Sequence, residues 1–102
     1  MTRSLETHTI NWRGTTVTVS YEAHWLGSDG PFSMAHLQLQ VIAPEGAILP
    51  VTETGYRSHF VHRAVIEDAG GPVAFATAWL DAAALSPDWK EREQALRQFT
   101  LF

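Results

Sequence analysis

Hydrophobic and polar residues alternate on both sides of Arg13-Gly14, near the start of the chain. A period of two on either side of a short turn that contains glycine predicts an antiparallel β-hairpin. The larger side chains that share one face are His8, Ile10 and Trp12 before the turn, and Val17, Val19 and Tyr21 after it. Threonine at most of the alternate positions indicates that the other face of this hairpin meets solvent.

Two more segments have strand character. In residues 34–43, Ala35, Leu37, Leu39 and Val41 alternate with polar residues, which predicts a third strand. The segment YRSHFVHRAVIE, residues 56–67, has a mixed pattern, so we expect a fourth and partly irregular strand there. Residues 26–33 and 44–55 are rich in glycine and proline and predict loops.

The last third of the chain changes in composition from β-branched residues to alanine, which favours helix. Pro72 follows Gly70-Gly71 and predicts the first turn of one helix. Its apolar stripe consists of Val73, Ala76, Leu80 and Ala83, with Phe75 and Trp79 beside it. Ser86-Pro87 predicts the cap and first turn of a second helix. On that second helix, Trp89, Leu96 and Phe99 share a face.

These elements predict an α+β fold: a small antiparallel sheet of three to four strands, starting with the N-terminal hairpin, followed by two C-terminal helices across one face. The alternative is a more barrel-like sheet with one helix plugging its end. Residues 1–102 contain no repeat, low-complexity tract or linker, so we expect one domain.

Composition narrows the chemistry. The 102 residues include no cysteine, which excludes disulfides and thiolate zinc sites. Seven basic and eleven acidic residues give a net charge of -4, which argues against direct binding of nucleic acid. The first fourteen residues lack the apolar core of a signal peptide, and no apolar run is long enough to cross a bilayer. We therefore expect a cytoplasmic protein that does not bind membranes.

The final segment, RQFTLF, places three large apolar residues within the last four positions. Its pentapeptide Gln98-Phe99-Thr100-Leu101-Phe102 resembles the short peptide by which many bacterial replication and repair proteins dock on the DNA polymerase sliding clamp. The resemblance implies that Gln98 is a polar anchor and that Leu101 and Phe102 fill an apolar pocket on the clamp. Phe99 departs from that motif, in which leucine is commonest at this place.

The alternative for the same residues is structural. A C-terminal helix often ends by packing its last apolar side chains into its own core, and Phe99 already falls on the apolar face of the predicted helix. Short motifs also occur by chance. The sequence leaves both interpretations of residues 98–102 open.

A second candidate surface lies in the polar segment 52–63. Arginine, histidine and tyrosine side chains there predict a site for a phosphate, a carboxylate or an acidic protein face; they are Tyr56, Arg57, His59 and Arg63. The alternative is that Arg57 and Arg63 pair with nearby acids, namely Glu53, Glu67 or Asp68, and only fix the loop to the sheet.

Catalytic signals are weak. Ser58 and His59 are adjacent and would point apart on a strand, although a distant pairing of Ser58 with His36 stays open. His59 and His62 are three apart, which is poor spacing for one metal ion on a strand. No nucleophile elbow, phosphate loop or dinucleotide fingerprint is present. We predict no enzymatic activity, no metal and no cofactor; a hydrolase built around His59 is the weakest alternative.

The whole chain also resembles small uncharacterised proteins of proteobacteria and their mobile elements, through its TETGYRSHF centre and its AGGPVAF helix start. That resemblance implies a bacterial cytosolic origin. Taken together, the sequence predicts a non-enzymatic adaptor or modulator that docks on the sliding clamp through its C-terminal peptide. The alternative is a module that binds a small ligand or nucleic acid through segment 52–63, with a purely structural tail.

Overall fold

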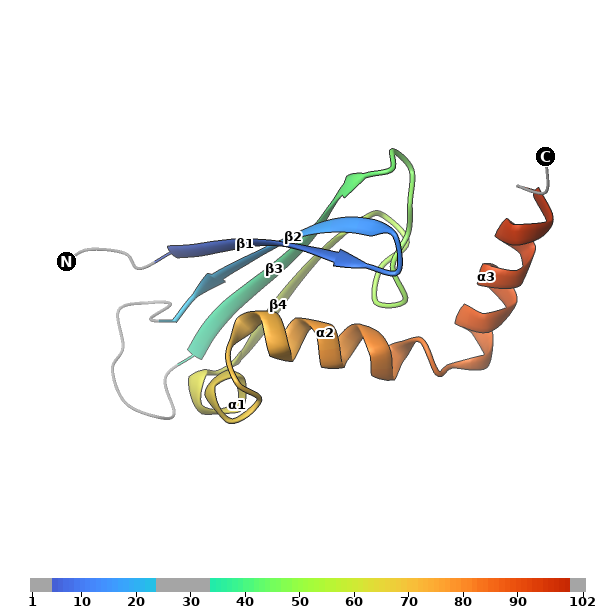
Figure 1. Cartoon of the computed structure of the whole chain (residues 1–102). Coiled ribbons are helices and arrows are strands. Elements are labelled where there is room, and N and C mark those ends of the chain that lie inside the picture. The colour runs from blue at the N-terminus through green and yellow to red at the C-terminus, as the bar shows by residue number, and fades with distance from the viewer. Residues whose placement is uncertain (1–4, 24–33, 100–102) are drawn as a thin grey trace.

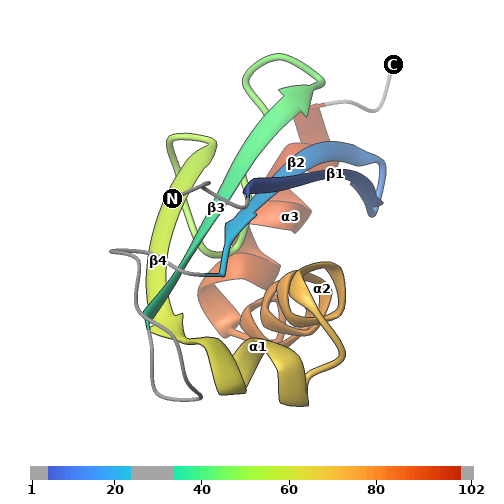
Figure 2. The same cartoon turned by 90° about the vertical axis from the view of Figure 1, so that its left-hand side faces the viewer.

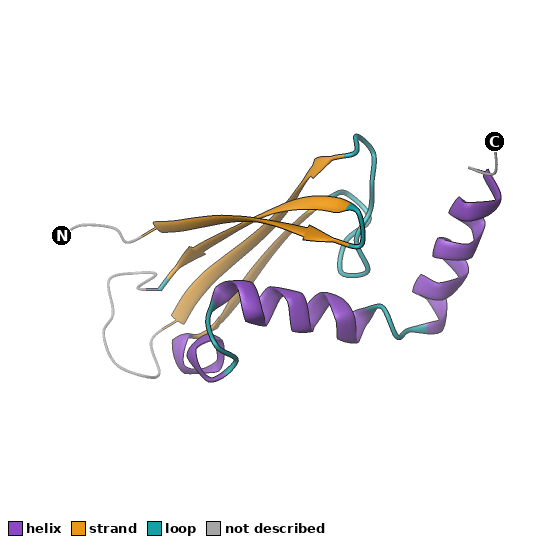
Figure 3. Cartoon of the chain, viewed as in Figure 1, coloured by secondary structure: helices purple, strands orange, loops and turns teal. Residues whose placement is uncertain are grey.

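The computed structural model describes residues 5–23 and 34–99, with side chains in this range up to Ala95. Within these ranges a sheet of antiparallel strands is followed by three helices; the first two lie along one side of the sheet, and the last stands at its hairpin end (Figures 1, 2 and 3). The elements are β1 (Leu5–Trp12), β2 (Thr15–Glu22), β3 (Met34–Ala43), β4 (Tyr56–His62), α1 (Arg63–Asp68), α2 (Pro72–Ala83) and α3 (Pro87–Phe99). The predicted α+β fold with an N-terminal hairpin and C-terminal helices is confirmed.

The β1–β2 hairpin forms where the sequence predicts it. Ile10 pairs with Val17 in an antiparallel register, and the turn lies at Arg13 and Gly14. Both turn residues have positive φ, 50° and 85°, which matches the twist of a tight hairpin. The Gly14 amide donates a hydrogen bond of 3.0 Å to Oδ1 of Asn11 and so satisfies the turn.

The sheet has the order β1-β2-β3-β4, with β1 and β4 at its edges, so it is open and not barrel-like. Strand alternation divides it into a face toward the helices and an outer face. The buried apolar residues of the core come from the helix-facing positions, the helices and one loop; they are Trp12, Val17, Val19, Tyr21, Ala35, Leu37, Leu39, Leu49, Ile66, Ala76, Leu80, Ala84 and Trp89. The outer face carries threonine, serine and glutamine along β1 to β3, together with larger side chains that include Met34, Tyr56 and Phe60.

The short helix α1 is a correction to the sequence prediction, which continued strand character through residue 67. The strand ends at His62 and Arg63 begins the helix. A continued strand would place Ile66 on the same face as Phe60 and His62, which is the outer face of the sheet. The helical turn instead buries Ile66 completely, at 0% exposure. Burial of this side chain therefore outweighs the local strand preference.

The two longer helices start at the predicted residues. Pro72 occupies the first turn of α2 after two glycines of positive φ. The amide of Trp89 donates a hydrogen bond of 3.2 Å to Oγ of Ser86, which caps α3. α2 buries Ala76 and Leu80 against the sheet.

Trp12, the last residue of β1, links three elements. Its Nε1 donates a hydrogen bond of 2.9 Å to Oδ1 of Asp81 in α2. Its ring lies 5.9 Å, between centroids, from the ring of Trp89 in α3. The end of the hairpin is thereby joined to both long helices.

The core predicts a clear difference between two leucines. Leu39→Ala removes a fully buried side chain, so we expect the free energy of unfolding to fall by about 2–5 kcal/mol. Leu85→Ala makes the same chemical change at a side chain that is 69% exposed, and should alter stability by less than about 0.5 kcal/mol. Urea denaturation of both variants measures the difference, and equal losses would contradict this description of the core.

Candidate functional site

The proposed docking peptide begins inside α3. The helix continues through Phe99, so Gln98 and Phe99 belong to its last turn. Leu101 and Phe102 lie outside the described residues, as do the side chains of residues 96–99. The structure thus gives the position of the start of the motif and leaves its role as a prediction.

α3 contacts the rest of the fold through residues of its first half. Trp89 is 6% exposed and packs on Trp12. Glu93 lies 3.6 Å from Nη1 of Arg13, and Arg92 forms an ion pair with Glu53 in the loop before β4. The remaining side chains from Lys90 to Ala95 are exposed; they are Lys90, Glu91, Gln94 and Ala95. Figure 1 shows this helix standing at the hairpin end of the sheet.

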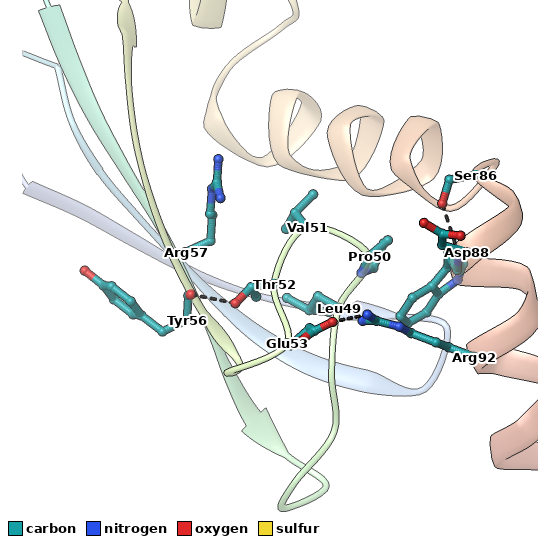
Figure 4. A pocket seen from close by; sticks show the side chains of 11 residues that line it. Leu49, Pro50, Val51, Thr52, Glu53, Tyr56, Arg57, Ser86, Asp88 and Arg92 are labelled. Atoms are coloured by element: carbon teal, nitrogen blue, oxygen red, sulfur yellow. Dashed lines mark hydrogen bonds and ion pairs between the residues drawn. The ribbon is translucent and has the colours of Figure 1, made fainter.

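The polar segment does not form a single surface. Tyr56 points to the outer face of the sheet, whereas Arg57 and His59 point to the helix-facing side. Figure 4 shows Tyr56 and Arg57 leaving β4 on opposite sides of the strand. Arg63 begins α1 and lies beyond the strand. The four predicted surface residues therefore separate into three places.

Arg57 and His59 share an aromatic environment on α2. The His59 ring lies 4.7 Å from the ring of Trp79 and 6.1 Å from that of Phe75. The Arg57 guanidinium lies 5.8 Å from the centre of the Trp79 ring. Burial lowers the pKa of His59 below 6.5, and the nearby charge of Arg57 lowers this pKa further. His59 is therefore neutral at pH 7.

The two arginines of the segment differ in their partners. Nε of Arg63 lies 3.3 Å from Oε1 of Glu67, one helical turn away, and the Arg63 side chain is mostly buried. This is one of the structural ion pairs that the sequence left open. Glu53 pairs with Arg92 instead of with Arg57. Within the described part of the chain Arg57 makes no ion pair.

A contact between Ser58 and His36 forms on the outer face. Ser58 Oγ lies 2.6 Å from Nε2 of His36, and the His36 ring stacks on Phe60 at 4.4 Å. Glu22 is the cross-strand neighbour of His36. Burial lowers the pKa of His36, and the Glu22 carboxylate opposes this to a smaller degree. The distant pairing of Ser58 with His36 that the sequence left open is therefore present as a hydrogen bond.

A cavity of about 480 Å³ lies between the loop before β4 and the start of α3 (Figure 4). Tyr56 and Arg57 line its strand side, and Trp89 and Arg92 line its helix side. The other lining residues are Leu49, Pro50, Val51, Thr52, Glu53, Ser86 and Asp88. Sequence reasoning missed the helix side, because nothing in the local pattern places residues 86–92 beside residues 49–57.

Nε1 of Trp89 has no hydrogen-bond partner although it is buried. Trp89 also lines a second cavity of about 580 Å³, toward the hairpin turn. Hollows on both sides of this residue show that α3 rests on the body over a narrow contact. Among the described residues, no group of three or more His, Cys, Asp or Glu side chains is placed to hold a metal ion.

Comparison with known proteins assigns the chain to a family. The family described as the KlcB third domain matches residues 5–89, and the chain therefore belongs to that family. No curated protein and no solved structure matches it. The whole-chain resemblance predicts membership of a family of small uncharacterised proteins, and the match agrees with this. The match carries no activity, partner or ligand with it.

The environment of His59 predicts a specific response to mutation. In Arg57→Gln the neighbouring charge is lost, so the pKa of His59 should rise, yet stay below 6.5 because burial is the larger cause. Titration of the histidine ring signals by NMR measures both values. Arg13→Gln removes a cation at the far end of the sheet and should leave the pKa of His59 unchanged.

The same shift predicts how stability depends on pH. A histidine with a lowered pKa in the folded state binds its proton first in the unfolded state. The free energy of unfolding should therefore fall as the pH decreases from 6.5 through the lowered pKa of His59. Urea denaturation across this range should show a smaller fall for His59→Gln than for the unmodified chain, and an equal fall would contradict the assignment.

Proposed function

We propose that this member of the KlcB third domain family is a non-enzymatic adaptor that docks on the bacterial sliding clamp through Gln98, Phe99, Leu101 and Phe102. The globular body is the part that is held at the clamp or that carries a second partner. This function operates in the bacterial cytoplasm, where the clamp encircles DNA. The acidic net charge of -4 agrees with contact to DNA through the clamp instead of through the body itself.

One observation supports the proposal most directly: the family match and the core end at the same residue. The match covers residues 5–89, and Trp89 is the last member of the described core cluster. The described side chains that follow it are exposed or half-buried. The proposed docking peptide therefore begins in the last turn of a helix that extends beyond the residues matched by the family.

The attachment of α3 also favours an accessible tail. Beyond Trp89, the described contacts of α3 include the ion pairs of Arg92 with Glu53 and of Glu93 with Arg13, whose side chains are all partly or largely exposed. Exposed ion pairs each contribute only about 0–1 kcal/mol and are weakened by salt. Weak attachment of α3 around Arg92 and Glu93 supports a proposal in which a partner reaches this end of the chain.

The size of the motif sets the expected affinity. Burial of a leucine and a phenylalanine supplies about 1.5–3 kcal/mol each, before the cost of ordering the peptide. Together with a polar anchor this corresponds to a dissociation constant on the order of micromolar. Transient docking of this strength suits a ring of repeated subunits, which presents several copies of one groove.

Within the described ranges none of the helices is long and apolar enough to cross a membrane. The Ser58–His36 hydrogen bond is the nearest approach to catalytic chemistry among the described residues. Ser58 lies on an exposed strand position of an outer sheet face. A hydrogen bond of this kind joins β3 to β4 and needs no substrate to account for it, so we interpret it as structural.

The test is binding to purified bacterial sliding clamp by isothermal titration calorimetry. The unmodified chain should bind with micromolar affinity. The double variant Leu101→Ala, Phe102→Ala should bind at least about 10-fold more weakly, because both apolar anchors are gone. Gln98→Ala should weaken binding by about 3- to 10-fold through loss of a hydrogen-bonded side chain.

Gln94→Ala is the matched control, because Gln94 is an exposed glutamine one turn earlier in α3 and lies outside the motif. It should bind like the unmodified chain. Melting temperatures of all variants separate docking from packing. If the double variant melts far below the unmodified chain, the tail belongs to the core and the proposal fails; the same holds if full-length protein does not bind.

A further inference from the structure

Arg57 differs from the other arginines whose side chains the structure describes. Arg13 pairs with Glu93, Arg63 with Glu67 and Arg92 with Glu53. Arg57 has no carboxylate partner among the described residues, although Glu53 is only four positions away. A cation without a carboxylate partner is available for a ligand.

The Arg57 guanidinium is held in place by an aromatic surface. It lies 5.8 Å from the centre of the Trp79 ring, and Trp79 is fixed in turn by its contacts with His59 at 4.7 Å and Phe75 at 6.1 Å. A guanidinium beside an aromatic ring still presents its N–H donors to a ligand. The contact favours one position of the cation and so reduces the entropy lost when a ligand binds.

The cavity beside Arg57 has the dimensions of a small-molecule site, at about 480 Å³. Figure 4 shows Arg57 on the strand side of the loop, with Ser86, Asp88 and Arg92 on the helix side. The half-buried Pro50 and Val51 supply apolar lining above the buried Leu49, and Thr52 supplies a hydroxyl. The Thr52 hydroxyl donates to the Tyr56 carbonyl at 2.8 Å and holds the loop against the strand.

The charges of the cavity select among oxyanions. Arg92 is neutralised by Glu53, and Asp88 adds a carboxylate on the helix side. The lining therefore offers one unpaired cation and one unpaired acid. Asp88 would repel a doubly charged phosphate more strongly than a singly charged carboxylate, and a carboxylate can bind the planar fork of Arg57 in a bidentate way.

We propose that Arg57 binds the carboxylate of a small organic acid or of a peptide side chain, and that the apolar part of this ligand lies in the cavity between β4 and α3. This site is distinct from the C-terminal peptide. Arg57 supplies the charge, Trp79 lies beside it, and Pro50 and Val51 contact the carbon skeleton.

The experiment is an NMR titration of the full-length chain, labelled with ¹⁵N, with N-acetylglycine as the probe. Saturable shifts are expected for the Arg57 side chain, the Thr52 amide and the Trp89 indole N–H. N-acetylglycinamide has the same shape without the charge, so it should bind with at most one tenth of the affinity of N-acetylglycine. Inorganic phosphate should also bind at least several-fold more weakly than N-acetylglycine.

Two substitutions test the residue. Arg57→Gln should weaken N-acetylglycine binding about 10-fold or more, since a charged hydrogen-bonded pair is lost. Arg57→Lys keeps the charge but loses the planar fork, so its affinity for N-acetylglycine should lie between that of the unmodified chain and that of Arg57→Gln. Arg13→Gln, at an arginine outside this cavity, should bind like the unmodified chain.

Equal shifts with the amide probe, or undiminished binding by Arg57→Gln, would overturn the proposal. A phosphate affinity above that of the carboxylate would overturn the selection of a single carboxylate. A longer probe, a tripeptide with one central glutamate, separates the two sources: tighter binding than N-acetylglycine identifies a peptide, and weaker binding identifies a small acid. Loss of clamp binding in the tail variants leaves these results unchanged, so the two proposals fail independently.

Discussion

The arrangement of the molecule depends on Trp12. This residue ends an edge strand, where a chain would otherwise separate from its helices, and its indole N–H is fixed to Asp81 of α2. The same ring supports Trp89, which is the buried anchor of α3. The guanidinium of Arg13 lies 4.8 Å above it and limits its exposure to solvent. Because the Trp12 side chain contacts both α2 and α3, the end of the hairpin helps to fix the position of α3 relative to the sheet. The helix in which the C-terminal peptide begins is thus positioned by a residue far away in sequence.

Strand alternation in β4 explains why its polar side chains lie on two different faces of the sheet. Tyr56 and Ser58 belong to the outer face, and Arg57 and His59 to the face that α2 covers. On the outer face Ser58 meets His36, whereas on the inner face Arg57 meets Trp79. A polar segment that looks like one cluster along the sequence therefore serves two environments. The inner environment adjoins the cavity that also receives residues of α3, and Arg57 is the charged residue of β4 that lines this cavity.

The predictable part of this structure is the part governed by local pattern. The alternation of hydrophobic and polar residues predicted the hairpin and β3 with the correct inward-facing residues. Pro72 and Ser86 correctly predicted where the two long helices begin. The helix α1 was missed because its advantage, burial of Ile66, depends on which sheet face the helices cover. The pairing of Ser58 with His36 spans 22 positions and was visible only as a possibility. The sequence also did not predict which acid pairs with each arginine, because Glu53 pairs with Arg92 of α3 and no local pattern brings these two residues together.

The cavity beside Arg57 lies between the part of the chain that the family matches and the C-terminal part of α3. Its strand side belongs to residues 49–57, inside the family match, and its helix side includes Arg92, just beyond the match. A ligand that contacts both sides would bind more tightly when α3 is in place than when it is detached. By linkage, such a ligand must also stabilise the docked position of α3. The exposed ion pairs of Arg92 and Glu93 contribute little on their own, so even modest binding in the cavity would change how firmly the helix is held. The two proposed sites are therefore separate in chemistry and are connected physically through Trp89, which anchors the helix and lines the cavity.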